Sequence, residues 1–413
     1  MLNSSFFTSI GTLIGFISGF VVTKVVAIYL GPGGIAVIGQ FQNFVAINTS
    51  FASGGIQQGV VKYLAEFREQ EDMKSVILTT SIRMTLFFAL ATGTVITLFS
   101  EWFAISLFNG DDYQYVIQLF GLTIVLFGLN TFLISILNGT GEIKKLVAIN
   151  ILTNLFSLFV SSLSAYFYGL GGALVAIAMS QSVVFFISVF FVRSSIWFQT
   201  KLFNYKFDKG YCLKLLEYTL MTVFGAVLIP LVNIWIRNHI IKELSLEQAG
   251  YWDSILKIST AYLGLITTSL SIYYLPKLSN LSDRLLIRRE IINGYKVITP
   301  ILIVMITTIY FLREYIILLL YSSEFLEMKI LFFPQLLGDF FKIMSWLLSF
   351  LMLAKAMTKL FLTTQVVFLS LNFILTIFFI SYMGLPGVVW SYVVTNFIYL
   401  IVIFFLFKSY LYK

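Results

Sequence analysis

The chain has few charged side chains, one cysteine and one histidine, and each scarcity narrows what it can be. Asp, Glu, Lys and Arg make up 11% of its 413 residues, whereas ordinary soluble domains carry about 25%, so a typical soluble domain is excluded. The single cysteine, Cys212, excludes an intrachain disulfide and a cysteine-based metal site. The single histidine, His239, follows NIWIR in what we expect to be a short outer loop. That position leaves no buried histidine for acyl-transfer chemistry.

Long apolar runs recur from one end of the chain to the other, and 59% of the residues are hydrophobic. A helix of about 20 residues crosses a hydrocarbon core of about 30 Å. The sequence therefore predicts an all-α polytopic membrane protein with twelve transmembrane helices. The expected spans are residues 6–30, 35–61, 76–99, 113–137, 146–168, 172–192, 214–236, 250–276, 292–312, 330–353, 360–381 and 385–407.

The positive charges are distributed unevenly between the two sides of the membrane that these spans define. Of the 27 Lys and Arg residues, 20 fall on the side of both termini, 4 on the opposite side and 3 within spans. Cytoplasmic loops carry such an excess, so we expect both termini in the cytoplasm. The net charge of +8 is then explained by topology and anionic membrane lipids, and nucleic acid is not an expected partner.

The two halves of the chain share short patterns at a constant separation. YGLGGALVA (Tyr168–Ala176) resembles MGLPGVVWS (Met383–Ser391) at an offset of 215 residues. Lys144 and Lys359, each of which opens the fifth span of its half, are separated by the same offset. An even number of spans in each half makes the repeats parallel, and transporters commonly place their substrate at a repeat interface. We therefore expect a central cavity and three segments: six-helix bundles at residues 1–193 and 214–413, and a cytoplasmic linker at 194–213.

Polar side chains form stripes along three of the expected spans. Steps of three, four or seven residues place them on one helical face. The second span carries Gln40, Asn43, Ser50, Gly54 and Gln57, the eighth Asp253, Lys257, Thr260, Gly264, Thr267 and Ser271, and the tenth Gln335, Asp339, Lys342, Ser345 and Ser349. Interhelical hydrogen bonds explain such stripes as well as a water-filled cavity does. We favour the cavity for the second and eighth spans, because these two are repeat mates.

Three lysines, Lys24, Lys257 and Lys342, lie deep within expected spans. A charge at the bilayer centre costs about 2.5–3.5 kcal/mol on insertion scales, so each lysine needs a partner or a function. Asp253 and Asp339 each lie one turn from a lysine, which permits neutral pairs, and Lys24 can alternatively snorkel toward the interface. Three cations against two acids leave a net positive interior, which predicts binding of an anion such as phosphate.

Three stretches resemble the O-antigen translocases, or Wzx-type flippases, of the multidrug/oligosaccharidyl-lipid/polysaccharide exporter superfamily. They are LGPGGIAVIGQFQNF in the first two spans, AGYWDSILKISTAYLGLITTSLSIYYLPKLS around the eighth (Ala249–Ser279) and QLLGDFFKIMSWLLSFLMLAKAMTKLF around the tenth (Gln335–Phe361). The pattern is most similar to that of lipid III flippases and covers essentially the whole chain. The resemblance implies two six-helix bundles around a V-shaped central cavity in the bacterial inner membrane.

The same resemblance implies a substrate and roles for the deep polar residues. Members of this family move undecaprenyl-diphosphate-linked oligosaccharides, such as O-antigen or enterobacterial common antigen units, from the cytoplasmic to the periplasmic leaflet, with coupling to a proton or sodium ion. By position, Lys24 and Lys257 match basic residues that hold the diphosphate in related lipid II flippases, and Lys342 would assist. The residues expected to meet the sugars are Gln40, Asn43, Gln57 and Thr260, and those expected to carry the coupling charge are Asp253 or Asp339. A polysaccharide polymerase and a chain-length regulator are expected partners.

Two other classes of function stay open from the residues alone. A multidrug or cation antiporter of the same fold would want more acids in its cavity, and the three deep lysines count against it. A membrane-bound polysaccharide polymerase or acyltransferase would want a large outer loop or a buried histidine, and we expect neither. No GxxxxGK[ST] motif and no zinc-ligand spacing occurs in the sequence, so we expect a transporter without a cofactor rather than an enzyme.

Overall fold

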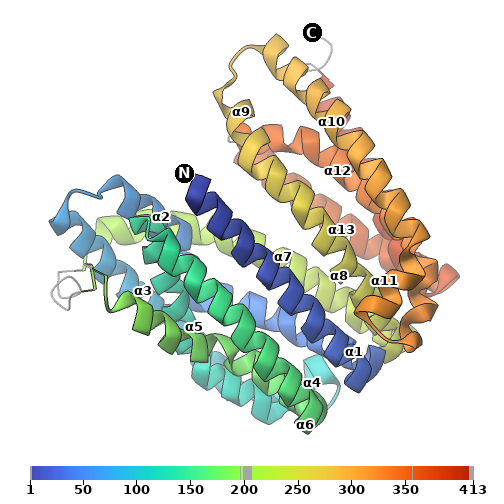
Figure 1. Ribbon diagram of the computed structural model, residues 1–413, viewed down its shortest axis with the longest axis horizontal. Coiled ribbons are helices and arrows are strands. Elements are labelled where there is room, and N and C mark those ends of the chain that lie inside the picture. Colours follow the sequence, from blue (N-terminus) through green and yellow to red (C-terminus); the bar gives the residue numbers. More distant parts are fainter. Residues whose placement is uncertain (1, 196, 199–206, 356, 409–413) are drawn as a thin grey trace. The chain divides into compact units, whose positions relative to one another are not determined.

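The computed structural model describes residues 2–195, 197–198, 207–355 and 357–408 of the protein, and these residues form helices joined by turns and short loops (Figure 1). The all-helical prediction is confirmed for them, and nine of their helices are long and apolar enough to cross a membrane. The chain divides into two compact units: unit 1 comprises Met1–Leu30 and Val37–Asn233, and unit 2 comprises Gly31–Ala36 and Ile234–Lys413. The linker expected at residues 194–213 lies partly outside the described residues.

Unit 1 is built from six helices and the first part of a seventh. They are α1 (Leu2–Ala52), α2 (Gln57–Glu66), α3 (Glu71–Leu98), α4 (Ser100–Phe108), α5 (Gln114–Thr140), α6 (Ile143–Val192) and α7 (Lys209–Glu243). The change from unit 1 to unit 2 falls within α7, between Asn233 and Ile234. It lies three residues after Pro230, which is inside the same helix and removes one backbone hydrogen bond there.

Glycines with left-handed backbone angles bend two long helices and separate two others. Gly31 has φ 63° inside α1 and Gly169 has φ 60° inside α6, a conformation that glycine adopts without the steric cost that a Cβ imposes. The two arms of each bent helix correspond to pairs of neighbouring spans expected from the sequence. Gly384, with φ 62°, separates two further helices and follows Gly169 by the same 215 residues that separate the sequence patterns.

The second expected span, residues 35–61, is not continuous. The α-helix stops at Ala52 and resumes at Gln57, so the prediction of one unbroken helix is wrong at this point. The break is supported by α7, where the Thr219 hydroxyl donates a hydrogen bond to the Gly54 carbonyl at 2.6 Å. Non-helical backbone at membrane depth needs such partners, because lipid offers none.

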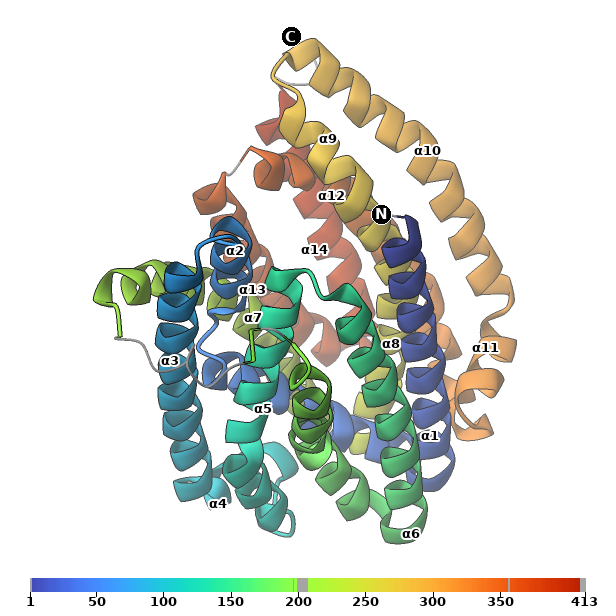
Figure 2. The same cartoon turned by 60° about the vertical axis from the view of Figure 1, so that its left-hand side comes forward.

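The core of unit 1 lies where α2, α3, α5, α6 and α7 meet. Buried aliphatic side chains from all five helices form one cluster; examples are Val60, Leu64, Ile77, Leu78, Ile136, Leu137, Val184 and Leu215. The first arm of α1 lies beside α6, as Figures 1 and 2 agree. Gly11 and Gly15 make this close approach possible, because a Cβ at Gly15 would lie 2.9 Å from the Asn154 amide nitrogen.

Unit 2 holds the rest of α7 and the remaining helices. They are α8 (Leu246–Ser269), the π-helix η2 (Leu270–Tyr274), α9 (Leu275–Asn280), α10 (Arg284–Phe311), α11 (Arg313–Leu320), the 3-10 helix η3 (Ser323–Leu331), α12 (Phe332–Ala354), α13 (Thr358–Met383) and α14 (Leu385–Leu406). The expected eighth span therefore runs through α8, η2 and α9 rather than through one α-helix. The short helices α4 and α11, each of which follows a long apolar helix, were not predicted.

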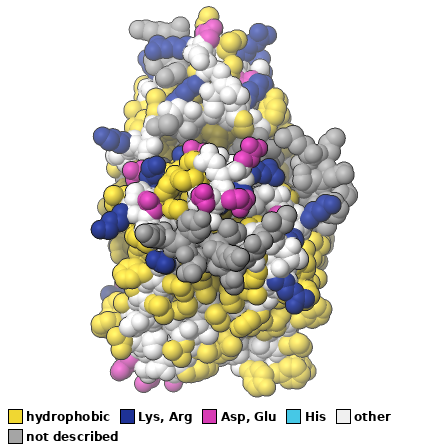
Figure 3. All heavy atoms as spheres, turned by 90° about the vertical axis from the view of Figure 1, so that its left-hand side faces the viewer, with side chains coloured by type: hydrophobic (Ala, Val, Ile, Leu, Met, Phe, Trp, Pro, Cys, Tyr) yellow, Lys and Arg dark blue, Asp and Glu magenta, His cyan; other side chains and the backbone are white. Residues whose placement is uncertain are grey.

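Charged side chains gather at one end of unit 1, where α2 and α3 are joined. The exposed residues of this connection include Glu66, Arg68, Glu69, Glu71 and Asp72. Figure 3 looks onto this side of the molecule and shows blue and magenta side chains collected in its upper part, with a mainly hydrophobic surface below. This division is typical of a helical unit whose charged end faces water and whose flank faces lipid.

Candidate functional site

Asp339 is the most deeply buried acid of unit 2 and lies at the centre of a polar cluster. Its carboxylate accepts hydrogen bonds from the Ser259 hydroxyl at 2.7 Å, the Tyr392 hydroxyl at 2.8 Å and the Gln335 amide at 3.3 Å. The Tyr262 hydroxyl is a fourth donor. An ionised carboxylate has about four acceptor positions, so these four neutral donors, which we call the Asp339 cluster together with Asp339, satisfy it.

Three helices deliver these donors, and helical spacing explains their positions. Ser259 and Tyr262 are three residues apart on α8, and Gln335 and Asp339 are four apart on α12, so each pair lies on one helical face. Tyr392 reaches the carboxylate from α14. The tenth-span stripe read from the sequence is thus a face that packs against α8 and α14.

Asp253, the other deep acid, is paired with an arginine. Arg237 Nε lies 2.7 Å from Asp253 Oδ2, and Arg237 Nη2 lies 2.5 Å from Oδ1, so the contact is bidentate. Both side chains are buried, and the guanidinium also lies 5.6 Å from the centre of the Trp252 ring. The expected pairing of Asp253 with Lys257 is therefore replaced by a pair that the sequence analysis did not contain.

Arg237 was missed because α7 is longer than its hydropathy suggested. The expected seventh span ended at residue 236, which left Arg237 and His239 in an outer loop. The helix continues to Glu243, so both residues are helical and Arg237 is buried. The apolar residues Ile240 and Ile241 that follow were the signal that the helix does not stop at the arginine.

The two lysines of unit 2 have no carboxylate partner among the described residues. Lys257 on α8 is half-buried, and neither an ion pair nor a hydrogen bond of its ammonium group occurs in the part of the chain that the structure describes. Lys342 on α12 is also half-buried, and its Nζ lies 5.3 Å from the centre of the Trp346 ring and 5.6 Å from that of Tyr392. Aromatic faces attract cations but leave the ammonium protons available. Both lysines therefore keep an uncompensated positive charge.

The remaining predicted residues are divided between the units. Unit 1 holds Lys24, Gln40 and Asn43 on α1 and Gln57 on α2; unit 2 holds Thr260 on α8. Gln40 is fully buried, Lys24, Asn43 and Gln57 are half-buried, and Thr260 is exposed. The Gln57 amide donates to the Ser53 hydroxyl at 2.6 Å, directly beside the break between α1 and α2. Within unit 2, the structure brings together the predicted residues of α8 and α12.

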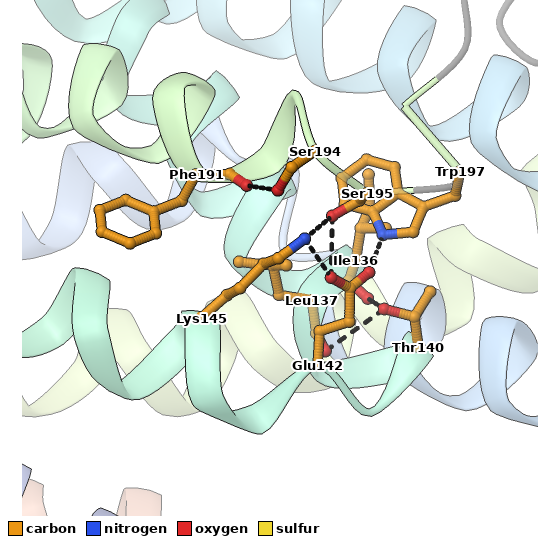
Figure 4. Close-up of polar contacts among 9 residues, drawn as sticks. All are labelled: Ile136, Leu137, Thr140, Glu142, Lys145, Phe191, Ser194, Ser195 and Trp197. Carbon is orange, nitrogen blue, oxygen red and sulfur yellow. Dashed lines mark hydrogen bonds and ion pairs between the residues drawn. The ribbon is translucent and has the colours of Figure 1, made fainter.

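A second polar cluster lies at the start of α6, away from these residues. The Glu142 carboxylate lies 2.7 Å from Lys145 Nζ, accepts from the Ser195 hydroxyl at 2.8 Å, and accepts from the Trp197 indole at 2.5 Å. Figure 4 shows these side chains converging on the carboxylate. Burial opposes ionisation of Glu142, but the hydrogen bonds from Lys145, Ser195 and Trp197 outweigh it and lower the pKa of the carboxyl below its ordinary value. This cluster fastens the segment after α6 to the start of the same helix.

Comparison with known proteins places this architecture in a family. A family model described as "Polysaccharide biosynthesis protein" matches residues 25–330. The chain belongs to this family. Over 399 residues it is 27% identical to a lipid III flippase of Escherichia coli (strain K12), which covers 97% of this chain and 96% of that protein. A lipid III flippase of Shigella flexneri gives the same identity and coverage.

Solved structures agree with this polysaccharide biosynthesis family at the level of the fold. The inward-facing form of a MATE-family multidrug resistance transporter of the MOP superfamily matches with a TM-score of 0.78 and 14% identity, over 99% of this chain and 98% of that chain. The lipid II flippase MurJ in an inward closed conformation matches with a TM-score of 0.77 and 18% identity, over 99% and 88%. The protein is thus a multi-pass membrane protein with a transporter fold, and these relatives are flippases and transporters rather than enzymes.

Removing the acid from the buried ion pair should destabilise this polysaccharide biosynthesis protein strongly. Asp253→Asn leaves Arg237 buried without its counter-charge, which typically costs about 3–5 kcal/mol. Thermal unfolding of the purified protein in detergent should show a clear fall in the midpoint. The control Glu71→Gln removes the exposed partner of Lys74, which is worth about 1 kcal/mol or less. Equal midpoints for the two variants would contradict the buried pair.

The Glu142 cluster should make a pH-dependent contribution to stability. Because its pKa is lowered on folding, the contribution is complete above the ordinary value of 4.5 and is lost as the pH falls through the lower folded value. Glu142→Gln should therefore unfold at a lower temperature than the unmodified protein at neutral pH, and the difference should shrink below that window. Glu69→Gln, at an exposed site, is the control. A difference that grew on acidification would rule out this ionised cluster.

Proposed function

We propose that this protein translocates an undecaprenyl-diphosphate-linked oligosaccharide from the cytoplasmic to the periplasmic leaflet of a bacterial inner membrane. The similarity to lipid III flippases over 97% of the chain supports a lipid-linked oligosaccharide as the class of substrate. The observation that carries the proposal is the state of the deep charges in unit 2. Each acid there is satisfied by a partner other than a lysine, and Lys257 and Lys342 keep their positive charges for an incoming anion.

A diphosphate is the anion that suits such a site. Its charges and the attached sugars cannot enter hydrocarbon without partners, because polar groups there lose their hydrogen bonds to water. The isoprenoid tail has no such cost and stays in the lipid. Lysine acts on phosphate as a point charge, and a fixed positive charge in surroundings of low dielectric constant attracts its ligand over a longer range than in water.

The other predicted residues take supporting roles in this proposal. Lys24 of unit 1 is a further cation for the diphosphate. Thr260 is exposed one turn from Lys257 and is suited to contact the first sugar, with Asn43 and Gln57 as further sugar contacts. Gln40 is fully buried, so it would contact a sugar only after α1 has moved.

Asp339 is the better of the two acids for coupling to a proton or sodium ion. Neutralising Asp253 would leave Arg237 buried without a counter-charge, whereas the donors around Asp339 are neutral and tolerate a change of its charge. Coupling through Asp339 would let ion binding favour one of two conformations, as a ligand with unequal affinity for them must. Asp253 then has a structural role.

We also propose the topology that such transport requires. The arms of α1 and α6, with α3, α5, α7, α8, α10, α12, α13 and α14, supply twelve spans, six before and six after residues 194–213. The pairs of glycines and sequence patterns 215 residues apart support two parallel repeats at residues 1–193 and 214–413. A central cavity and cytoplasmic termini stay predictions.

Charge removal at the proposed diphosphate site tests this function directly. Lys257→Ala and Lys24→Ala should each lower translocation of a lipid-linked oligosaccharide in proteoliposomes by about 10- to 100-fold, because a hydrogen bond to a charged group is worth about 1.5–3 kcal/mol. In cells, both variants should lose surface polysaccharide at normal protein levels. The control Lys329→Ala removes a lysine of an exposed ion pair with Glu314 and should transport normally. Full activity of both alanine variants would reject the diphosphate role.

A further inference from the structure

One aromatic ring touches both kinds of charge that the proposed transport cycle needs. The hydroxyl of Tyr392 on α14 donates to Asp339 Oδ1 at 2.8 Å. The face of the same ring lies 5.6 Å from the ammonium of Lys342. We propose that Tyr392 is a positioning residue that couples the charge of Asp339 to the availability of Lys342. This inference rests on the proposed function of those two residues.

The packing around Tyr392 fixes its ring between the two charges. Gly338 precedes Asp339 on α12, and a Cβ at Gly338 would overlap the Tyr392 ring. The ring therefore occupies a slot that only a glycine leaves open, with Asp339 next to it and Lys342 one turn further along the helix. A ring held in this way cannot change its contact with one charge without changing its contact with the other.

The chemistry of the two contacts gives the coupling a direction. A hydrogen bond to an ionised carboxylate is about twice as strong as one between neutral groups, so neutralising Asp339 by a proton or a cation weakens its hold on the hydroxyl. The ring is then free to shift, and Lys342 loses part of the aromatic surface that holds it, which leaves its ammonium more available to a phosphate oxygen. Coupling of this kind is reciprocal: binding of an anion at Lys342 must favour neutralisation of Asp339 by the same factor.

The groups around Asp339 leave few other sources of such an effect. The titratable side chains that face it are Tyr262 from α8, Tyr392 from α14 and Lys342 on its own helix. The other elements packed on α12 are α9, α10, α13 and η3, and over the described ranges none of them makes an ion pair with this carboxylate. Tyr392 is the one donor of the Asp339 cluster whose ring also contacts Lys342 in the structure.

Two substitutions of Tyr392 separate its two contacts. Tyr392→Phe keeps the ring over Lys342 and removes the hydroxyl, whereas Tyr392→Leu removes both. In proteoliposomes, Tyr392→Phe should move the pH midpoint of translocation upward by about one pH unit, because the ionised carboxylate loses a donor. Its affinity for undecaprenyl diphosphate should stay within about twofold of the unmodified protein, while Tyr392→Leu should change that affinity by about 3- to 10-fold.

Two further variants complete the experiment. Gly338→Ala keeps every polar group but displaces the ring, so it should change both the pH midpoint and the affinity. Tyr295→Phe is the matched control, because the Tyr295 hydroxyl donates to the Met344 carbonyl of the same helix at 2.6 Å and touches neither charge. It should lose some thermal stability and leave the pH midpoint unchanged.

The outcomes distinguish this inference from the proposed function. If the unmodified protein neither binds undecaprenyl diphosphate nor translocates its glycosylated form, the proposed function fails. If it does both and the pH profile of Tyr392→Phe matches that of Tyr295→Phe, Tyr392 has only a structural role and the inference is overturned. A shifted profile with retained affinity in Tyr392→Phe supports the coupling.

Discussion

The ion pair between Arg237 and Asp253 decides which charges of unit 2 are open. Inside a helical unit at membrane depth, an unpaired charge is costly, so each acid takes the partner that geometry allows. The bidentate contact of Arg237, at 2.7 and 2.5 Å, occupies both oxygens of Asp253. Lys257, one turn further along α8, is left without a carboxylate of its own, and this excess positive charge is the basis for anion binding.

The second acid is neutralised by a different physical means. Asp339 is held by hydroxyl and amide donors, which stabilise its negative charge without contributing a positive one. Such a site tolerates both an ionised and a neutral carboxyl, whereas an arginine-bound acid does not. The two acids of unit 2 are thereby separated into a structural one and one suited to change its charge during transport.

Hydropathy was enough to predict most of the fold, because the cost of exposing polar groups to lipid is large and depends only on residue type. The helical class, most of the spans and the paired patterns around Gly169 and Gly384 follow from it. The interruption at residues 53–56 does not, because its support comes from Thr219, which is 165 residues away. Short helices such as α4 and α11 are also too brief to stand out in a run of apolar residues.

The candidate site was only partly predictable for the same reason. Spacing placed Asp253 and Lys257 on one face of a helix correctly, but it could not reveal that Arg237 from a neighbouring helix binds the acid first. Tyr392 carried no signal either, because 17% of the chain is aromatic and its role depends on the slot above Gly338. Partner choice between helices is a property of packing rather than of sequence periodicity.

The central claim, that Lys257 and Lys342 are open to a diphosphate, can be measured by amine-reactive labelling of the protein in liposomes, followed by mass spectrometry. Undecaprenyl diphosphate should protect both lysines from the reagent, and undecaprenol, which has the same tail without phosphate, should not. Equal labelling of Lys257 and Lys342 with the two lipids would contradict the account.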